Sequence, residues 1–383
     1  MKKILLFTLT SILCFNACNN DDTTSIRELY GNSPNAFVTI WKTDEPEGYT
    51  EDNQIEIPGS GTNYKIFWEE VGNPNNNGLE TATNSHTITF PKAGIYKVSI
   101  SGGTPAFHQI KFSSPYLDND KIISIEQWGN IEWSSFNHAF NYCKALEINA
   151  KDNPNLKKVK DMSSMFKACW MLEYGVSDWD LSNVTDMNEM FLGARYFNDD
   201  ISSWDVSSVT NMAFMFYGNH TFNQDISNWD VSNVTNMTGV FAECRNFNQD
   251  ISSWDVSKAT SMHGMFYQSN FNNDISNWDV SNVTNMTGVF AQCRNFNQDI
   301  SSWDVNKVIS MHGMFVGAES FNQNISGWDV SNVTDMSYMF SAAESFNQNI
   351  SDWDVSNVTE CFYFSENSGL ELNYIPSLQG GCN

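Results

Sequence analysis

Residues 222–241 read Phe222-Asn-Gln-Asp-Ile-Ser-Asn-Trp-Asp-Val-Ser-Asn-Val-Thr-Asn-Met-Thr-Gly-Val-Phe241. Copies of this stretch recur along the second half of the chain, and their Trp-Asp dipeptides are 25 residues apart at every step except one of 24. So regular a period predicts one supersecondary unit stacked on copies of itself, because a single unit could not bury its apolar face alone. The dipeptides begin at Trp179, Trp204, Trp229, Trp254, Trp278, Trp303, Trp328 and Trp353.

The first half of each unit has the spacing of a short strand. Ile226, Trp229 and Val231 follow the apolar-x-x-apolar-x-apolar spacing of a leucine-rich repeat. Trp229 and Val231 alternate with Asp230, so a strand would turn both apolar side chains inward and Asp230 outward.

The second half of each unit has the spacing of a short amphipathic helix. Val234, Met237, Phe241 and Cys244 lie at i, i+3, i+7 and i+10, which places them on one helical face. We therefore expect an α/β solenoid, similar to leucine-rich repeats, with about ten coils of short strand plus short helix. Two degenerate coils, around Trp128 and Pro154, complete that count.

Two other repeat folds have features in common with this pattern. WD40 propellers also carry Trp-Asp, but their period exceeds 40 residues, so the spacing excludes them. A pure parallel β-helix stays open if the Met-Phe segment is extended rather than helical.

The N-terminus resembles a bacterial lipoprotein leader. A basic start and a short apolar run predict a signal peptide over residues 1–17. Ala17-Cys18 resembles the end of a lipobox, and the residues after it resemble the acidic export signal of Bacteroidetes surface lipoproteins. The resemblance implies that Cys18 is lipidated, that residues 18–35 form a tether, and that the protein is anchored at the outer membrane and cell surface; a plain cleaved signal peptide is the alternative.

Residues 36–113 are expected to form a small all-β sandwich, because short β-branched and aromatic runs alternate with turn residues. The module resembles a PKD-like immunoglobulin domain, and Trp68-Glu69-Glu70 echoes the Trp-Gly-Asp-Gly turn of that family. Turns are expected at Pro58-Gly59, over residues 73–78 and at Gly102-Gly103. The expected strands span residues 37–41, 64–68, 87–90, 94–100 and 107–112.

The repeat string, Trp-Asp-Val-Ser-Asn-Val-Thr-Asn-Met followed by Met-Phe and Phe-Asn-Gln, resembles the BspA-like surface proteins and mycoplasma-type lipoprotein repeats. This resemblance covers roughly residues 36–370. It implies a repeat domain, here residues 120–364 with a C-terminal cap over 365–383, that serves adhesion or host and matrix binding without enzymatic activity.

Composition narrows the possible partners. The chain has 20 basic and 45 acidic residues, a net charge of −25. Nucleic acid and anionic membrane surfaces are therefore poor partners. No nucleophile elbow, zinc-protease motif or phosphate loop occurs, so we expect no catalytic residues and no enzyme.

Cysteines offer candidate disulfides. Cys143 and Cys169 occupy equivalent positions in adjacent coils, within disulfide reach, and Cys361 with Cys382 could pin the C-terminal tail. Buried free thiols are the alternative. His263 and His312 are explained by duplication of a two-coil unit, because the stretch from Trp229 reappears 49 residues later.

Aspartates form two columns. The candidate binding stripe is the outward column, and a second column precedes the core Ile; Ca²⁺ bridging of these carboxylates is one hypothesis, and hydrogen bonding to turn amides is the other. We expect the stripe to bind a basic protein or matrix ligand, with a structural spacer, or carbohydrate binding by the sandwich, as alternatives. The stripe is Asp180, Asp205, Asp230, Asp255, Asp279, Asp304, Asp329 and Asp354, and the second column is Asp200, Asp225, Asp250, Asp274 and Asp299.

Overall fold

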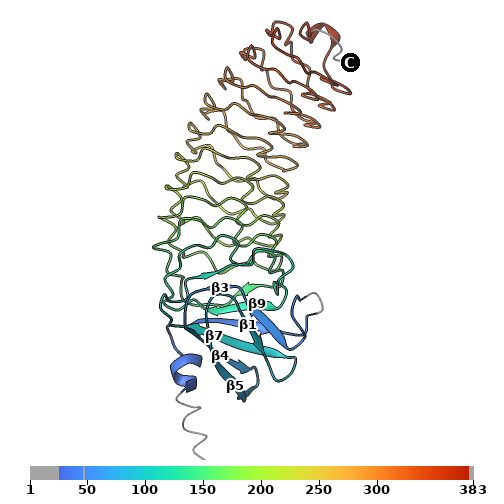
Figure 1. Cartoon of the computed structure of the whole chain (residues 1–383). Coiled ribbons are helices and arrows are strands. Elements are labelled where there is room, and N and C mark those ends of the chain that lie inside the picture. Colours follow the sequence, from blue (N-terminus) through green and yellow to red (C-terminus); the bar gives the residue numbers. More distant parts are fainter. Residues whose placement is uncertain (1–25, 46–47, 379–383) are drawn as a thin grey trace, which may run out of the picture.

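The computed structural model describes residues 26–45 and 48–378 of the 383-residue chain. A β-rich N-terminal module (residues 26–127) forms the base, and a long bent column of coils, the repeat stack (residues 128–370), rises from it (Figure 1). Residues 1–17, Cys18 and residues 19–25 of the predicted tether lie outside the described residues.

The N-terminal module is built on one six-stranded mixed sheet with the order β10-β9-β1-β7-β4-β5, flanked by the two-stranded sheets β2-β6 and β3-β8. Strand β7 is antiparallel to both β1 and β4. The strands are β1 Phe37–Lys42, β2 Gln54–Ile57, β3 Gly59–Ser60, β4 Tyr64–Glu70, β5 Asn73–Ala82, β6 His86–Thr89, β7 Ile95–Ser101, β8 Gln109–Ile110, β9 Ile122–Gln127 and β10 Glu147–Ile148.

The predicted turn over residues 73–78 is wrong, because these residues begin β5. A tight turn at Val71-Gly72, with Gly72 at φ 82°, reverses the chain and pairs Asn73 with Glu70. Strand β5 lies at the sheet edge, where Pro74 needs no N–H for a further partner.

The predicted α/β solenoid, with a strand and a helix in each coil and a small sandwich before it, is also wrong. Among the described residues the helices are a single π-helical turn, η1 (Arg27–Gly31), and a 3-10 turn, η2 (Leu372–Tyr374). Successive coils are joined by isolated parallel bridges rather than by strands. One series of bridges links nine successive coils, through Asp161, Asp186, Asn211, Asn236, Ser261, Asn285, Ser310, Asp335 and Glu360.

A run of turns replaces the expected helix. Backbone amides in this run alternate between two kinds of acceptor: one residue donates to the next coil, and the following residue donates to the carbonyl three residues back. Continuous i→i−4 bonding, which defines an α-helix, is therefore absent. In one coil Met187, Glu189, Phe191 and Gly193 donate to the next coil, and Met190, Leu192 and Ala194 donate within their own.

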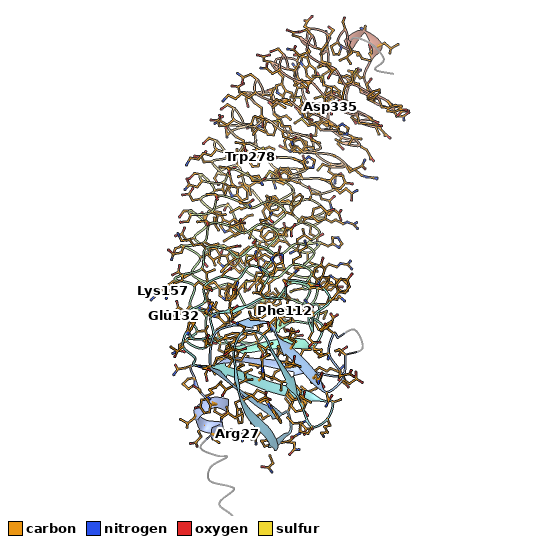
Figure 2. The ribbon with its side chains drawn as sticks, viewed as in Figure 1. Arg27, Phe112, Glu132, Lys157, Trp278 and Asp335 are labelled. Carbon is orange, nitrogen blue, oxygen red and sulfur yellow. The ribbon has the colours of Figure 1, made fainter. Side chains whose placement is uncertain are left out.

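Stacked rings fill the core of the repeat stack. Trp229 and Val231 are buried and Asp230 is exposed, so the predicted inward and outward directions are confirmed, although no strand forms there. Neighbouring Trp rings are parallel, with centroids 6.4 Å apart for Trp229 and Trp254. From Trp229 to Trp353 each indole Nε1 donates to an Ile carbonyl of the preceding coil, as Trp254 does to Ile226 at 3.0 Å. Trp278 lies within this body of coils (Figure 2).

The repeat stack bends because its walls have different spacings. Backbone-bonded chains lie ~4.8 Å apart, whereas successive Trp rings are 6.2 to 6.5 Å apart. The wider spacing of the Trp rings fans the coils apart on that side, and the repeat stack is bent along its length in Figure 1.

Both ends of the stack are covered. Strand β10, from the first coil, pairs in parallel with β9, and Phe37 packs against Trp128 and Trp133 with centroids 5.7 and 5.1 Å away. One continuous apolar cluster runs from Phe37 to Leu370. Tyr374 and Ile375 pack against it at the other end. Such caps are needed because each open coil would expose its core.

A fully buried ion pair anchors the N-terminal module. Asp118 and Lys121 are 3.6 Å apart and both have no exposed side-chain surface. The Lys121 ammonium donates to the carbonyls of Thr50, Glu51 and Gln54. The Asp118 carboxylate accepts from the amides of Tyr49, Thr50 and Glu56. The pair thus pins the loop before β2 to the segment that leads into β9.

Candidate functional site

Two residues in every coil have a left-handed backbone, and they form two columns along the stack. Only Gly adopts this conformation without steric cost. The first column is His138, Ser164, Glu189, Phe214, Gly239, Gly264, Gly288, Gly313, Tyr338 and Tyr363; the second is Tyr142, Ala168, Gly193, Gly218, Glu243, Gln268, Gln292, Gly317, Ala342 and Asn367.

Four successive coils have glycine in the first column, and their missing side chains leave a groove of about 350 Å³. Phe214 and Tyr338, which have almost the same φ as the four glycines, flank them along the column. The Phe214 ring leans over the next coil, since a Cβ on Gly239 would lie 2.5 Å from Phe214 Cδ1. We call this feature the glycine groove; its floor is Gly239, Gly264, Gly288 and Gly313.

Large and small side chains alternate along one border of the glycine groove. Tyr217, Tyr267 and Val316 come from every second coil, and the coils between them contribute Ala242 and Ala291. The border therefore has two hollows, at Ala242 and at Ala291. Because the coil step is ~4.8 Å, these hollows repeat every ~9.6 Å.

Polar groups in the glycine groove are few. The Tyr267 hydroxyl accepts from Gln268 Nε2 at 2.8 Å, which leaves its own proton to be donated. The Tyr217 hydroxyl donates to Glu243 at 2.6 Å, and this bond raises the pKa of Tyr217 to about 12.

The two histidines border the groove two coils apart. Partial burial lowers the pKa of His263, so its imidazole is neutral at pH 7. His312 Nδ1 lies 3.2 Å from Asp335 Oδ2, and its ring meets Tyr338 edge-on at 5.6 Å. Asp335, labelled in Figure 2, thus orients His312 near the C-terminal end of the groove. Sequence reasoning attributed these histidines to duplication alone.

The predicted Asp stripe lies elsewhere. All eight side chains are exposed and none borders the glycine groove. In each, Oδ1 accepts from the backbone amide two residues later, at 3.0 Å for Asp230 and Ser232. The second column makes the same turn, as Asp225 does with Ser227 at 2.9 Å. Each carboxylate therefore shapes a turn.

The described residues contain no candidate metal site. Within the part of the chain that the structure describes, no group of three or more His, Cys, Asp or Glu side chains is placed to hold a metal ion.

Acid should destabilise the repeat stack through these turns. Hydrogen bonds from the serine hydroxyl and amide lower the pKa of the carboxyl despite repulsion from neighbouring carboxylates. Because the folded pKa is below the unfolded value of about 3.9, the stabilisation is present above that value and is lost as the pH falls through the folded pKa. The affected residues are Asp180, Asp200, Asp225, Asp230, Asp250, Asp255, Asp274, Asp279, Asp299, Asp329 and Asp354.

Thermal melts followed by circular dichroism at pH 7, 5, 4 and 3 check this expectation. The melting temperature should change little between pH 7 and 5 and fall below about pH 4. A melting temperature that is constant or rises down to pH 3 would contradict it.

The cysteines of the stack are structural. Cys143 and Cys169 are both free thiols, so the predicted bond between them is not formed. The Cys169 thiol donates to the Phe140 carbonyl of the preceding coil at 3.0 Å, and burial raises its pKa. Cys361 is disulfide-bonded, and its predicted partner Cys382 lies outside the described residues.

The fold defines the class of protein: a repeat protein of stacked turn-rich coils, capped at its N-terminal end by a β-rich module. The family described as "Mycoplasma protein of unknown function, DUF285" matches residues 134–229, 200–272 and 268–373, well over half of the chain. The chain belongs to that family. No curated protein and no solved structure matches it. None of the helices described is long and apolar enough to cross a membrane.

Proposed function

We propose that this protein binds other proteins at the cell surface and that the glycine groove is its principal binding site. The groove is the observation that carries the proposal. It is concave, mainly apolar and bordered by tyrosines, which are features of protein recognition sites. The groove exists because four coils have glycine at the position where other coils have Phe214 or Tyr338. The backbone conformation at this position is nearly the same in all of them.

The Asp stripe would contribute to the same function by attracting the partner electrostatically. Its exposed carboxylates and the net charge of −25 would attract a basic partner over a long range and raise the association rate. Contact in the groove would then give specificity. The resemblance to BspA-like surface proteins, and the lipobox-like Ala17-Cys18, support lipid anchoring at a bacterial surface.

Filling the glycine groove tests the proposal. We expect that Gly288→Phe retains the fold, because phenylalanine occupies the equivalent position at 214 with nearly the same φ. The new ring should lie over Gly313, as Phe214 lies over Gly239. The matched control is Gly327→Phe, which adds the same ring at an open, exposed position away from the groove.

A random peptide library displayed on phage should be panned against the immobilised protein, and a glycan array should be probed in parallel. Selected peptides are expected to bind wild type and Gly327→Phe equally and to bind Gly288→Phe about tenfold more weakly or worse. Failure to enrich any peptide, or equal binding to Gly288→Phe, would overturn the groove as the site. Glycan binding without peptide binding would assign the protein to carbohydrate capture.

A further inference from the structure

We propose that the occupant of the glycine groove is a proline-rich protein segment in the polyproline II conformation, lying along the axis of the repeat stack. This inference rests on the proposed function and adds the class of ligand. Four independent observations support it: the spacing of the hollows, the length of the groove, the hydrogen bonding of its floor and the carboxylates at its two ends.

The spacing of the hollows matches a three-residue period. Ala242 and Ala291 lie two coils apart, ~9.6 Å. A polyproline II helix rises 3.1 Å per residue with three residues per turn, so the same face returns every ~9.3 Å. Every third side chain of such a segment would enter a hollow, and Tyr267 would stand between two of them. A β-strand repeats a face every ~6.6 Å and would lose register after one hollow.

The glycine groove is long enough for about two and a half turns. The coils of Phe214 and Tyr338 are five steps apart, ~24 Å, which corresponds to about eight residues of polyproline II. A segment of this length would cover both hollows and end against the aromatic residues that flank the glycine floor.

The groove floor cannot pair with a strand. From Met262 to Ser269 every backbone amide already has an acceptor, either in the next coil, in its own turn or in the Ser261 hydroxyl. Recognition by strand addition needs unpaired amides, whereas a polyproline II ligand needs none. It requires aromatic surfaces for its rings and a few donors for its outward carbonyls. Tyr217 and Tyr267 offer the surfaces, and the Tyr267 hydroxyl proton offers a donor.

Charge indicates basic flanks on the ligand. Glu243 lies beside Tyr217 toward one end, and Asp335 lies beside His312 toward the other. Arginine or lysine just outside the proline-rich core would meet these carboxylates and the acidic molecule as a whole.

Fluorescence anisotropy with labelled decapeptides tests the inference. The probe has an arginine at each end and repeats proline, proline and leucine between them. One comparison peptide has leucine at every second position among valine and threonine, and a second replaces proline with glycine and serine. We expect the proline-rich probe to bind wild type and Gly327→Phe at least about tenfold more tightly than either comparison peptide.

Two variants resolve the site further. Gly288→Phe should abolish probe binding. Ala291→Tyr should also weaken it about tenfold or more, since it fills one hollow and removes the two-coil alternation, while Val316 and Tyr267 remain in place. Circular dichroism confirms that each variant is folded.

The outcomes separate the two claims. Tighter binding of the β-forming peptide, still lost in Gly288→Phe, would overturn the polyproline ligand and leave the groove as a protein-binding site. Equal binding of all three peptides would also overturn the ligand class. If neither the decapeptides nor any panned peptide binds, the proposed function itself fails.

Discussion

Lys121→Met should lower the free energy of unfolding of the N-terminal module by about 3–5 kcal/mol. Methionine fills much of the lysine volume but leaves the Asp118 carboxylate and three backbone carbonyls without their cation, in a site that water does not reach. An uncompensated buried charge of this kind is among the most destabilising changes in a protein core. Hydrogen exchange of the β1 and β7 amides measures the loss.

Lys158→Met is the matched control. Lys158 pairs with Glu132 at 2.7 Å, but both side chains are about two-thirds exposed, and Glu132 is labelled at the edge of the first coils in Figure 2. Exposed pairs contribute about 0–1 kcal/mol. Equal losses of stability in the two variants would show that the buried pair does not hold the N-terminal module together.

Trp254→Ala should remove about 3–5 kcal/mol from the stability of the middle coils. The substitution creates a cavity between the rings of the neighbouring coils and deletes the bond from the indole to the Ile226 carbonyl. Trp254→Phe keeps an aromatic ring but leaves that carbonyl without a donor, so we expect a smaller loss of about 1–3 kcal/mol.

Hydrogen exchange along the chain measures which coils are destabilised by Trp254→Ala. In a linear array each unit contacts only its neighbours, so protection should fall in the coils around residue 254 and much less at the caps. A uniform loss of protection from β1 to residue 370 would instead indicate one cooperative unit.

The repeat period of the sequence predicted that the coils stack and which side chains face the core, because the pattern of burial repeats in every coil whatever its backbone conformation. The period could not decide whether the second half of each coil is a helix or a run of turns. Met187, Met190, Phe191 and Ala194 all face the core, a spacing that suits a helix of 3.6 residues per turn and a run of four-residue turns equally. The informative signal was glycine at the left-handed positions, such as Gly264 and Gly313, since glycine is unfavourable inside a helix.

The glycine groove was missed for a related reason. Its four glycines belong to the repeated string, and nothing in that string marks them as departures from Phe214 and Tyr338 in the same column. Only the backbone angles show that all ten positions of that column are equivalent. The Asp columns were conspicuous in sequence for the opposite reason: they recur in nearly every coil because every coil makes the same turn.

The coil that contains Tyr267 is one residue shorter than its neighbours, and this difference has an evolutionary consequence. Phe271 still stacks on Phe247 of the preceding coil, with ring centroids 6.1 Å apart. Its amide donates to the Ser269 hydroxyl, whereas the Phe247 amide donates to the Cys244 carbonyl. A residue can thus be lost at this corner without disturbing the rings. Since coils join only to their neighbours, genes of this kind can lengthen or shorten by whole coils while both ends remain closed. The length of the repeat stack can therefore change in evolution independently of the residues that form any binding surface.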